Sequence, residues 1–177
     1  MTLRVAVVVY IYAIYFRELW VAARSFTRLG FSINAALLGL SYGCIVNQTQ
    51  FAGLYSPGII LGAPLLLAAL VLLEWAGHSI RGRFFSYIGN HDIPKFVFQQ
   101  GPFAYIRHPF YTSYWLSHTA VALMFPNLVT AFIAIGTFML LWLTAAFEER
   151  KFASSTVAEE YRKYSDRTGR FLPRVQR

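Results

Sequence analysis

The segment 101–111 reads Gly-Pro-Phe-Ala-Tyr-Ile-Arg-His-Pro-Phe-Tyr, and it lies immediately before a long uncharged run. Pro109 suits the first position of a helix, where its missing N–H costs nothing, and it biases the preceding His108 toward an extended conformation. Arg107 could orient an anionic group there, and His108 could move a proton. The alternative is that both residues only anchor a helix end at a membrane interface.

A pair of carboxylates, Glu148 and Glu149, follows the uncharged run. Acidic groups near a helix C-terminus oppose the helix dipole, at a cost of a few tenths of a kcal/mol each. A cationic sulfonium ligand that carries a ribose would use them, because it needs anionic or aromatic surroundings and hydroxyl acceptors, to which Tyr105 and Tyr111 could add. The alternative is a solvated helix end with the next two basic residues as counter-ions.

A third group of polar residues lies in the basic tail and could hold an anionic acceptor. The alternative is electrostatic attachment to anionic lipid headgroups, at roughly 1 kcal/mol per basic residue. The group comprises Tyr161, Arg162, Tyr164, Arg167 and Arg170, followed by Phe171-Leu172-Pro173.

The elements that must position these residues are membrane helices. Of the 177 residues, 56% are apolar and only 14% are charged, and the runs 32–51, 58–73 and 110–147 contain no Lys, Arg, Asp or Glu. Runs of this length suit a bilayer and would leave a soluble domain unable to bury its apolar surface. The sequence predicts an all-α, polytopic transmembrane bundle of about five spans, at 3–22, 31–47, 58–75, 110–125 and 128–147.

The basic residues predict the orientation of these spans. Of the 16 Lys and Arg, three lie between residues 17 and 28, four between 81 and 107, and eight from 150 onward. Under the positive-inside rule, the N-terminus is expected outside and the C-terminus in the cytoplasm. The membrane is then a bacterial inner membrane or that of the endoplasmic reticulum. This placement of charge favours membrane lipids over nucleic acid as partners. A lone cysteine, Cys44, excludes a disulfide framework or a cysteine-based metal site within the chain.

The last two spans are joined only through Pro126-Asn127, which predicts an antiparallel helical hairpin. The residues before 110 and after 147 are therefore expected to be neighbours. Residues 148–164 have the spacing of an amphipathic helix on the membrane surface. We expect one membrane domain, with spans and a connection in residues 1–100 and the catalytic hairpin and cytoplasmic helix in residues 101–177.

In this order, the motifs resemble the isoprenylcysteine carboxyl methyltransferase family and the related phospholipid methyltransferases. The resemblance covers roughly residues 101–173: Gly-Pro-aromatic-x-Tyr-x-Arg-His-Pro-x-Tyr, the hairpin, the paired glutamates, Tyr161-x-x-Tyr164, and Arg170-Phe171-x-Pro173. Thr156-Val157 stands where the family commonly has Phe-Gly, and Tyr161 comes one residue later than usual.

The resemblance implies S-adenosylmethionine as cofactor, S-adenosylhomocysteine as product, and no metal. It implies a lipidic or hydrophobic acceptor that enters from the bilayer. The expected catalytic residues are Arg107, His108 and Glu148. The expected cofactor contacts are Gly101, Tyr105, His108, Pro109, Tyr111, Glu148 and Glu149. The expected acceptor contacts are Tyr161, Arg162, Tyr164 and Arg170.

The acceptor class and two other functions stay open. A prenylcysteine-type carboxylate is the first expectation, because it is ionised at neutral pH and needs no base, and Arg107, Arg162 or Arg170 could orient it. An aminophospholipid is the next, and there His108 or a glutamate must accept a proton. The alternatives are an NADPH-dependent reductase of the sterol type and a non-catalytic scaffold or lipid-binding protein.

Overall fold

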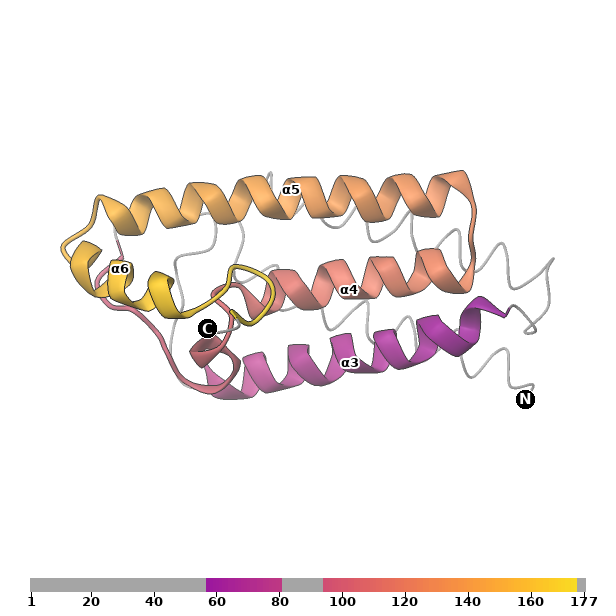
Figure 1. The fold of residues 1–177 in the computed structure, drawn as a ribbon, viewed down its shortest axis with the longest axis horizontal. Helices are drawn as coiled ribbons and strands as arrows, with labels where there is room; N and C mark the ends of the chain where they lie inside the picture. Colours follow the sequence, from indigo (N-terminus) through magenta and orange to yellow (C-terminus); the bar gives the residue numbers. More distant parts are fainter. Residues whose placement is uncertain (1–56, 81–93, 175–177) are drawn as a thin grey trace.

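The computed structural model describes residues 57–80 and 94–174, and its regular elements are all helical. Two of the expected spans, 3–22 and 31–47, lie outside the described residues. In chain order the elements are α3 (Gly58–Ser79), the short 3₁₀ helix η1 (Gly101–Ala104), α4 (Pro109–Met124), α5 (Leu128–Ala153) and α6 (Ala158–Arg167) (Figure 1). This confirms the all-α class.

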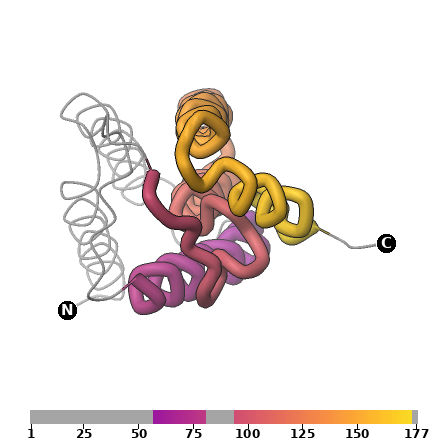
Figure 2. The backbone as a smooth tube through the Cα atoms, turned by 90° about the vertical axis from the view of Figure 1, so that its left-hand side faces the viewer, coloured from indigo at the N-terminus to yellow at the C-terminus, as the bar shows by residue number. Residues whose placement is uncertain are grey.

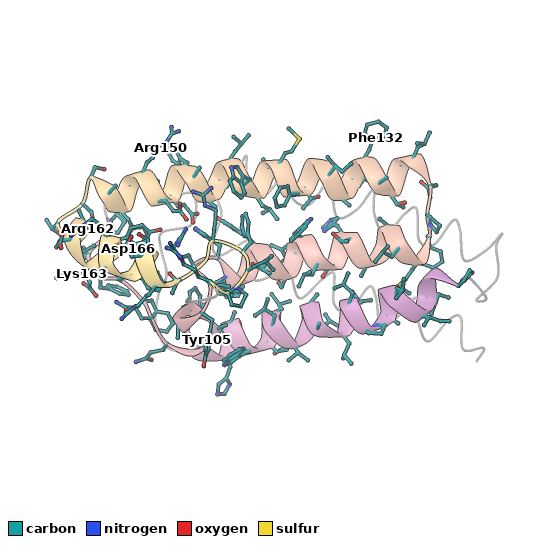
Figure 3. All side chains as sticks on the ribbon, viewed as in Figure 1. Tyr105, Phe132, Arg150, Arg162, Lys163 and Asp166 are labelled. Atoms are coloured by element: carbon teal, nitrogen blue, oxygen red, sulfur yellow. The ribbon has the colours of Figure 1, made fainter. Side chains whose placement is uncertain are left out.

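Three long helices run side by side, with α4 between α3 and α5 (Figure 1). Among the described residues, α3 and α5 are long and apolar enough to cross a membrane. The outer face of α5 is apolar and exposed: Phe132 points away from the bundle (Figure 3), as a side chain that faces lipid should. The main buried cluster lies among the three helices and the tail; it comprises Leu73, Ala76, Phe110, Tyr111, Tyr114, Leu141, Ala145 and Phe171.

The turn between α4 and α5 is fixed by a capping box. The Asn127 side chain accepts a hydrogen bond from the Thr130 backbone N–H at 3.0 Å, and the Thr130 hydroxyl accepts one from the Asn127 N–H at 3.3 Å. The Thr130 hydroxyl also lies 2.8 Å from the Phe125 carbonyl oxygen, to which it can donate. These bonds satisfy polar backbone groups that a tight turn would otherwise leave unpaired.

One expected boundary was wrong. We expected a single surface helix over residues 148–164, but α5 continues to Ala153, and α6 begins only at Ala158. Two serine hydroxyls explain the break, because Ser154 donates to the Arg150 carbonyl and Ser155 donates to the Phe152 carbonyl. Such local bonds compete with helix continuation. The paired glutamates therefore belong to the last turns of α5, beyond its apolar stretch.

The close approach of α3 to α4 depends on glycine. A Cβ atom on Gly62 would lie 2.7 Å from the Ala120 carbonyl oxygen and 2.2 Å from the Met124 side chain. Small residues of this kind let membrane helices pack backbone to backbone. Gly77, in the same helix, has nothing within 4 Å of such a Cβ.

We predict that Gly62→Ala destabilises the protein by about 1–3 kcal/mol, because α4 must shift to make room. Gly77→Ala is the matched control and should be neutral or stabilising by up to about 1 kcal/mol, since alanine favours helix. Unfolding of both variants in one detergent measures the difference. Equal stabilities would show that the α3–α4 contact is looser than described.

Candidate functional site

The loop before α4 pairs with the tail after α6. The Arg107 N–H donates to the Gly169 carbonyl at 2.8 Å, the His108 N–H to the Arg170 carbonyl at 3.1 Å, and the Gly169 N–H to the Tyr105 carbonyl at 3.3 Å. These bonds surround a parallel bridge between Ile106 and Gly169. The loop and α6 lie at the same end of the three helices (Figures 1 and 2). Segments sixty residues apart in sequence thus form one unit.

Glu149 is the centre of this unit. Its carboxylate accepts from Arg107 Nε at 2.9 Å and from Arg170 Nη2 at 2.5 Å, and it lies 3.3 Å from His108 Nε2. The Glu149 side chain is only 15% exposed. It therefore joins α5, the loop and the tail through a partly buried ion pair with two guanidinium groups.

Glu148 faces a different set of partners. The Tyr111 hydroxyl donates to Glu148 Oε1 at 2.6 Å, and His108 Nδ1 lies 3.6 Å from Glu148 Oε2. The rings of His108 and Tyr111 are stacked, with centroids 5.3 Å apart and planes 2° from parallel. Two adjacent glutamates therefore contact opposite nitrogens of one imidazole, because neighbours on a helix point about 100° apart.

Pro109 begins α4, as the sequence predicted, and His108 precedes the helix with φ −123° and ψ 63°. The Thr112 hydroxyl lies 3.0 Å from the His108 carbonyl and 2.9 Å from the Phe171 carbonyl, and can donate to either. The backbone of His108 is thus held by both α4 and the tail. This limits the positions that its ring can take.

The two carboxylates have opposite pKa shifts. Burial raises the pKa of Glu148, an effect that the nearby His108 and Tyr111 only partly offset. Burial also acts to raise the pKa of Glu149, but hydrogen bonds from His108, Arg170 and Arg107 outweigh it and hold that pKa well below its ordinary value. Glu149 is therefore a fixed anion, while Glu148 is a carboxylate that can exchange a proton more readily.

Several contacts of this site could not be expected from sequence. Arg107 also donates to the backbone carbonyls of Ser165 and Thr168, and the Arg170 guanidinium lies over the Trp142 ring at 4.4 Å from its centroid. Carbonyl acceptors carry no residue signature, and Trp142 stands in an apolar run like any other membrane aromatic residue. Only the tail pattern that ends in Arg170 pointed to this region.

The expected site residues divide into those that join the cluster and those that do not. Arg107, His108, Tyr111, Glu148, Glu149 and Arg170 come together, and Pro109 holds the loop. Tyr161 and Tyr164 are buried beside Val97, and the Tyr164 hydroxyl donates to the Phe103 carbonyl at 2.7 Å. Burial raises the pKa of both phenols, so both stay protonated near neutral pH.

Tyr105, Gly101 and Arg162 also lie outside this cluster. Tyr105 is 57% exposed, and its ring lies 6.1 Å from that of Trp75 (Figure 3). Gly101 has φ 60°, which favours glycine, and sits against Ser79. Arg162 is 67% exposed and pairs with Glu159 within α6. Within the described residues, no group of three His, Cys, Asp or Glu could hold a metal ion.

A comparison with protein families adds a further observation to this geometry. The profile of the phospholipid methyltransferase family matches residues 57–160, more than half of the chain. The chain belongs to this family. The match includes α3, the Arg-His-Pro loop, α4, α5 and the first residues of α6. No curated protein and no solved structure matches the chain.

Family membership and the helices support one coarse conclusion. The family is one of methyltransferases, and α3 and α5 have the length and apolar composition of membrane spans. The chain is therefore a membrane methyltransferase of the phospholipid methyltransferase family. This bears out the family resemblance that the sequence motifs indicated.

We predict that Glu149→Gln destabilises this methyltransferase by about 3 kcal/mol, because two partly buried guanidinium groups lose their counter-ion. A carboxylate with a lowered pKa stabilises the fold above its ordinary pKa of 4.5 and loses that effect as the pH falls. The difference in the free energy of unfolding between the variant and wild type should therefore be largest above about pH 5 and shrink below pH 4.5. Thermal unfolding at several pH values measures it.

The exposed carboxylate of Glu159 is the matched control, since Glu159→Gln should leave the stability close to that of wild type. A stability difference for Glu149→Gln that does not depend on pH would contradict the role of its charge.

Proposed function

We propose that the protein transfers a methyl group from S-adenosylmethionine to a lipidic acceptor at the cytoplasmic surface of the membrane. The supporting observation is the contact between two motifs about forty residues apart, in which Tyr111 donates to Glu148 and His108 lies between Glu148 and Glu149. Family membership supplies the reaction class. The polar cluster beyond the apolar stretch of α5 supports the proposed location.

The residues of the cluster fit a sulfonium cofactor. Glu148 is a partly buried carboxylate that no arginine contacts in the described residues, and the stacked His108 and Tyr111 rings lie beside it. Carboxylates and aromatic faces are the groups that stabilise an organic cation. When bound, S-adenosylmethionine would supply an electrophilic methyl group, whose transfer depends on alignment and on exclusion of water.

We assign different roles to the paired glutamates. Glu148, with Tyr111 and His108, is proposed to contact the cofactor. Glu149 is proposed to act as a positioning residue, because its oxygens are already occupied by Arg107, Arg170 and His108. Arg107 is assigned to the same positioning function, which departs from the catalytic role that the sequence suggested.

The contacts of the arginines favour an amine acceptor over a carboxylate. Arg107 and Arg170 would have to leave Glu149 in order to bind an acceptor carboxylate, and Arg162 is exposed on α6. An ammonium headgroup needs an anionic site and a proton acceptor, and Glu148 and His108 offer both. We therefore place an aminophospholipid before a prenylcysteine-type carboxylate.

We further propose the five-span arrangement, with 1–100 and 101–177 as parts of one membrane domain, an outer N-terminus and a cytoplasmic C-terminus. The charge distribution along the sequence supports this orientation. The cluster would then take its cofactor from the cytoplasm and its acceptor from the bilayer.

We predict that the purified protein in nanodiscs binds S-adenosylmethionine with micromolar affinity and does not bind NADPH. Glu148→Gln should weaken the binding of S-adenosylmethionine about tenfold, because a charged partner of the cation is lost. Calorimetric titration measures both. Glu159→Gln should bind as wild type does.

The same titration tests the other functions. Binding of NADPH alone would indicate a reductase, and binding of neither ligand by a folded sample would favour a scaffold. Tighter binding of S-adenosylmethionine by Glu148→Gln would contradict the assignment of Glu148.

The pH dependence of methyl transfer should distinguish the acceptors. With an amine acceptor the rate should rise with pH, because a proton must be removed and the raised pKa of Glu148 moves its base form to higher pH. With a carboxylate acceptor, whose pKa is about 4, the rate should be nearly constant from pH 6 to 9. Parallel assays with phosphatidylethanolamine and a prenylcysteine measure both profiles. A flat profile with phosphatidylethanolamine would contradict a proton-accepting role for the cluster.

A further inference from the structure

Two buried polar side chains in the middle of the α4–α5 pair have no hydrogen-bond partner for one atom each. They are His118, through Nε2, and Thr137, through Oγ1. His118 is 3% exposed and Thr137 is 1% exposed. A buried polar atom without a partner is unfavourable, because it has given up its hydrogen bonds to water and made none in return. Two such atoms within the part of the chain that the structure describes require an explanation.

Thr137 is an exception among the hydroxyls of its helices. In the described helices α4 and α5, the other Ser and Thr side chains each have a backbone carbonyl within hydrogen-bond reach, mostly one turn earlier. These are Thr112, Ser113, Ser117, Thr119, Thr130 and Thr144. The Thr137 hydroxyl is buried without such a bond. It is therefore available to another polar group.

The contacts of His118 determine what Nε2 can bind. Its Nδ1 lies 2.7 Å from the Tyr114 carbonyl oxygen, which can only accept, so Nδ1 carries the proton. Burial in an apolar layer disfavours a second proton on the ring. Nε2 then presents a lone pair, and its missing partner must be a hydrogen-bond donor.

Two contacts between α4 and α5 place the two side chains at one level. Trp115 of α4 packs against Phe138 of α5, with ring centroids 4.8 Å apart. His118 comes about one turn after Trp115 on α4, and Thr137 comes one residue before Phe138 on α5. Because the two helices are antiparallel, both side chains lie on the same side of the Trp115–Phe138 contact along the helix axes. Tyr111, on the same face of α4 as His118, contacts Glu148 of α5. His118 and Thr137 therefore lie on facing sides of α4 and α5.

We propose that His118 and Thr137 form an inner subsite that binds a hydroxyl group on an alkyl or acyl chain, such as a hydroxylated acyl chain of the acceptor lipid. A hydroxyl can donate to His118 Nε2 and accept from the Thr137 hydroxyl, which satisfies both atoms at once. Its carbon chain would contact the apolar rings of Trp115 and Phe138. The subsite lies seven residues, or about 10 Å, deeper along α4 than Tyr111.

Other occupants fit this place less well. An ammonium group would bring a charge into an apolar layer, at a high cost. A buried water molecule usually has about three polar partners, and the unpaired buried side-chain atoms among the described residues are two. The assignment to the acceptor rests on the proposed methyltransferase function, whereas the binding of a hydroxyl does not.

The test compares 1-dodecanol with its methyl ether as probes, added at equal mole fractions to the protein in nanodiscs. We expect dodecanol to raise the thermal unfolding temperature and the ether, which cannot donate, to have a much smaller effect. Thr137→Val and His118→Leu should each weaken the dodecanol effect, so that roughly tenfold more dodecanol is needed for half-maximal protection. Thr137→Ser should restore it to within about twofold of wild type.

Thr144→Val is the matched control, because the Thr144 hydroxyl is already bonded to the Leu140 carbonyl at 2.8 Å. It should leave the preference for dodecanol unchanged. Without a probe, Thr137→Val and His118→Leu should be as stable as wild type or more stable, since each removes an unpaired polar atom.

Three outcomes would overturn the subsite: equal protection by dodecanol and the ether, equal loss in Thr137→Val and Thr144→Val, or a loss of basal stability with no effect on the probes. The last would indicate a structural water only. Titration of S-adenosylmethionine into the same samples separates this result from the proposed function. Failure to bind S-adenosylmethionine, with the dodecanol preference intact, would remove the methyltransferase proposal and leave the hydroxyl site.

Discussion

The end of the helical bundle that carries the polar cluster depends on one carboxylate. Glu149 accepts from Arg107 of the loop before α4 and from Arg170 of the tail, and it lies beside His108. Phe171 of the tail packs in the main buried cluster, and the charges together with the backbone pairing around Ile106 and Gly169 align the three segments with one another. Partly buried ion pairs are weak sources of net stability but strict about geometry. Here the geometry of these ion pairs holds the His108 imidazole in place.

This arrangement explains how two identical neighbours can differ in chemistry. Glu148 and Glu149 have the same side chain and sit one residue apart on α5, yet burial raises the pKa of the first while arginines and an imidazole lower that of the second. The difference arises from which side of the helix each faces. Glu149 is held as an anion by its partners, whereas Glu148 has a raised pKa in a poorly hydrated place.

Much of the fold was predictable because lipid restricts what a chain can do. Uncharged runs predicted α3, α4 and α5, and Pro109 correctly predicted where α4 begins. The tight turn brought the Arg-His-Pro loop and the paired glutamates together as expected. The break at residues 154–157 was missed because serine bonding to carbonyls depends on local conformation rather than on apolar periodicity. Carbonyl acceptors for Arg107 and the packing of Arg170 on Trp142 were missed because they depend on tertiary contacts.

The cap at Asn127 fixes where α5 begins. The length of the helix then fixes both the position and the direction of the side chains at its other end. Between that cap and the glutamates lie twenty apolar or uncharged residues, which set both how far the carboxylates extend and which way each one points. A single-residue insertion would rotate everything beyond it by about 100° and move it by 1.5 Å, presenting a different side chain to the arginines. In this family member, then, the apolar stretch of α5 should tolerate exchanges of one apolar residue for another far better than any change in its length.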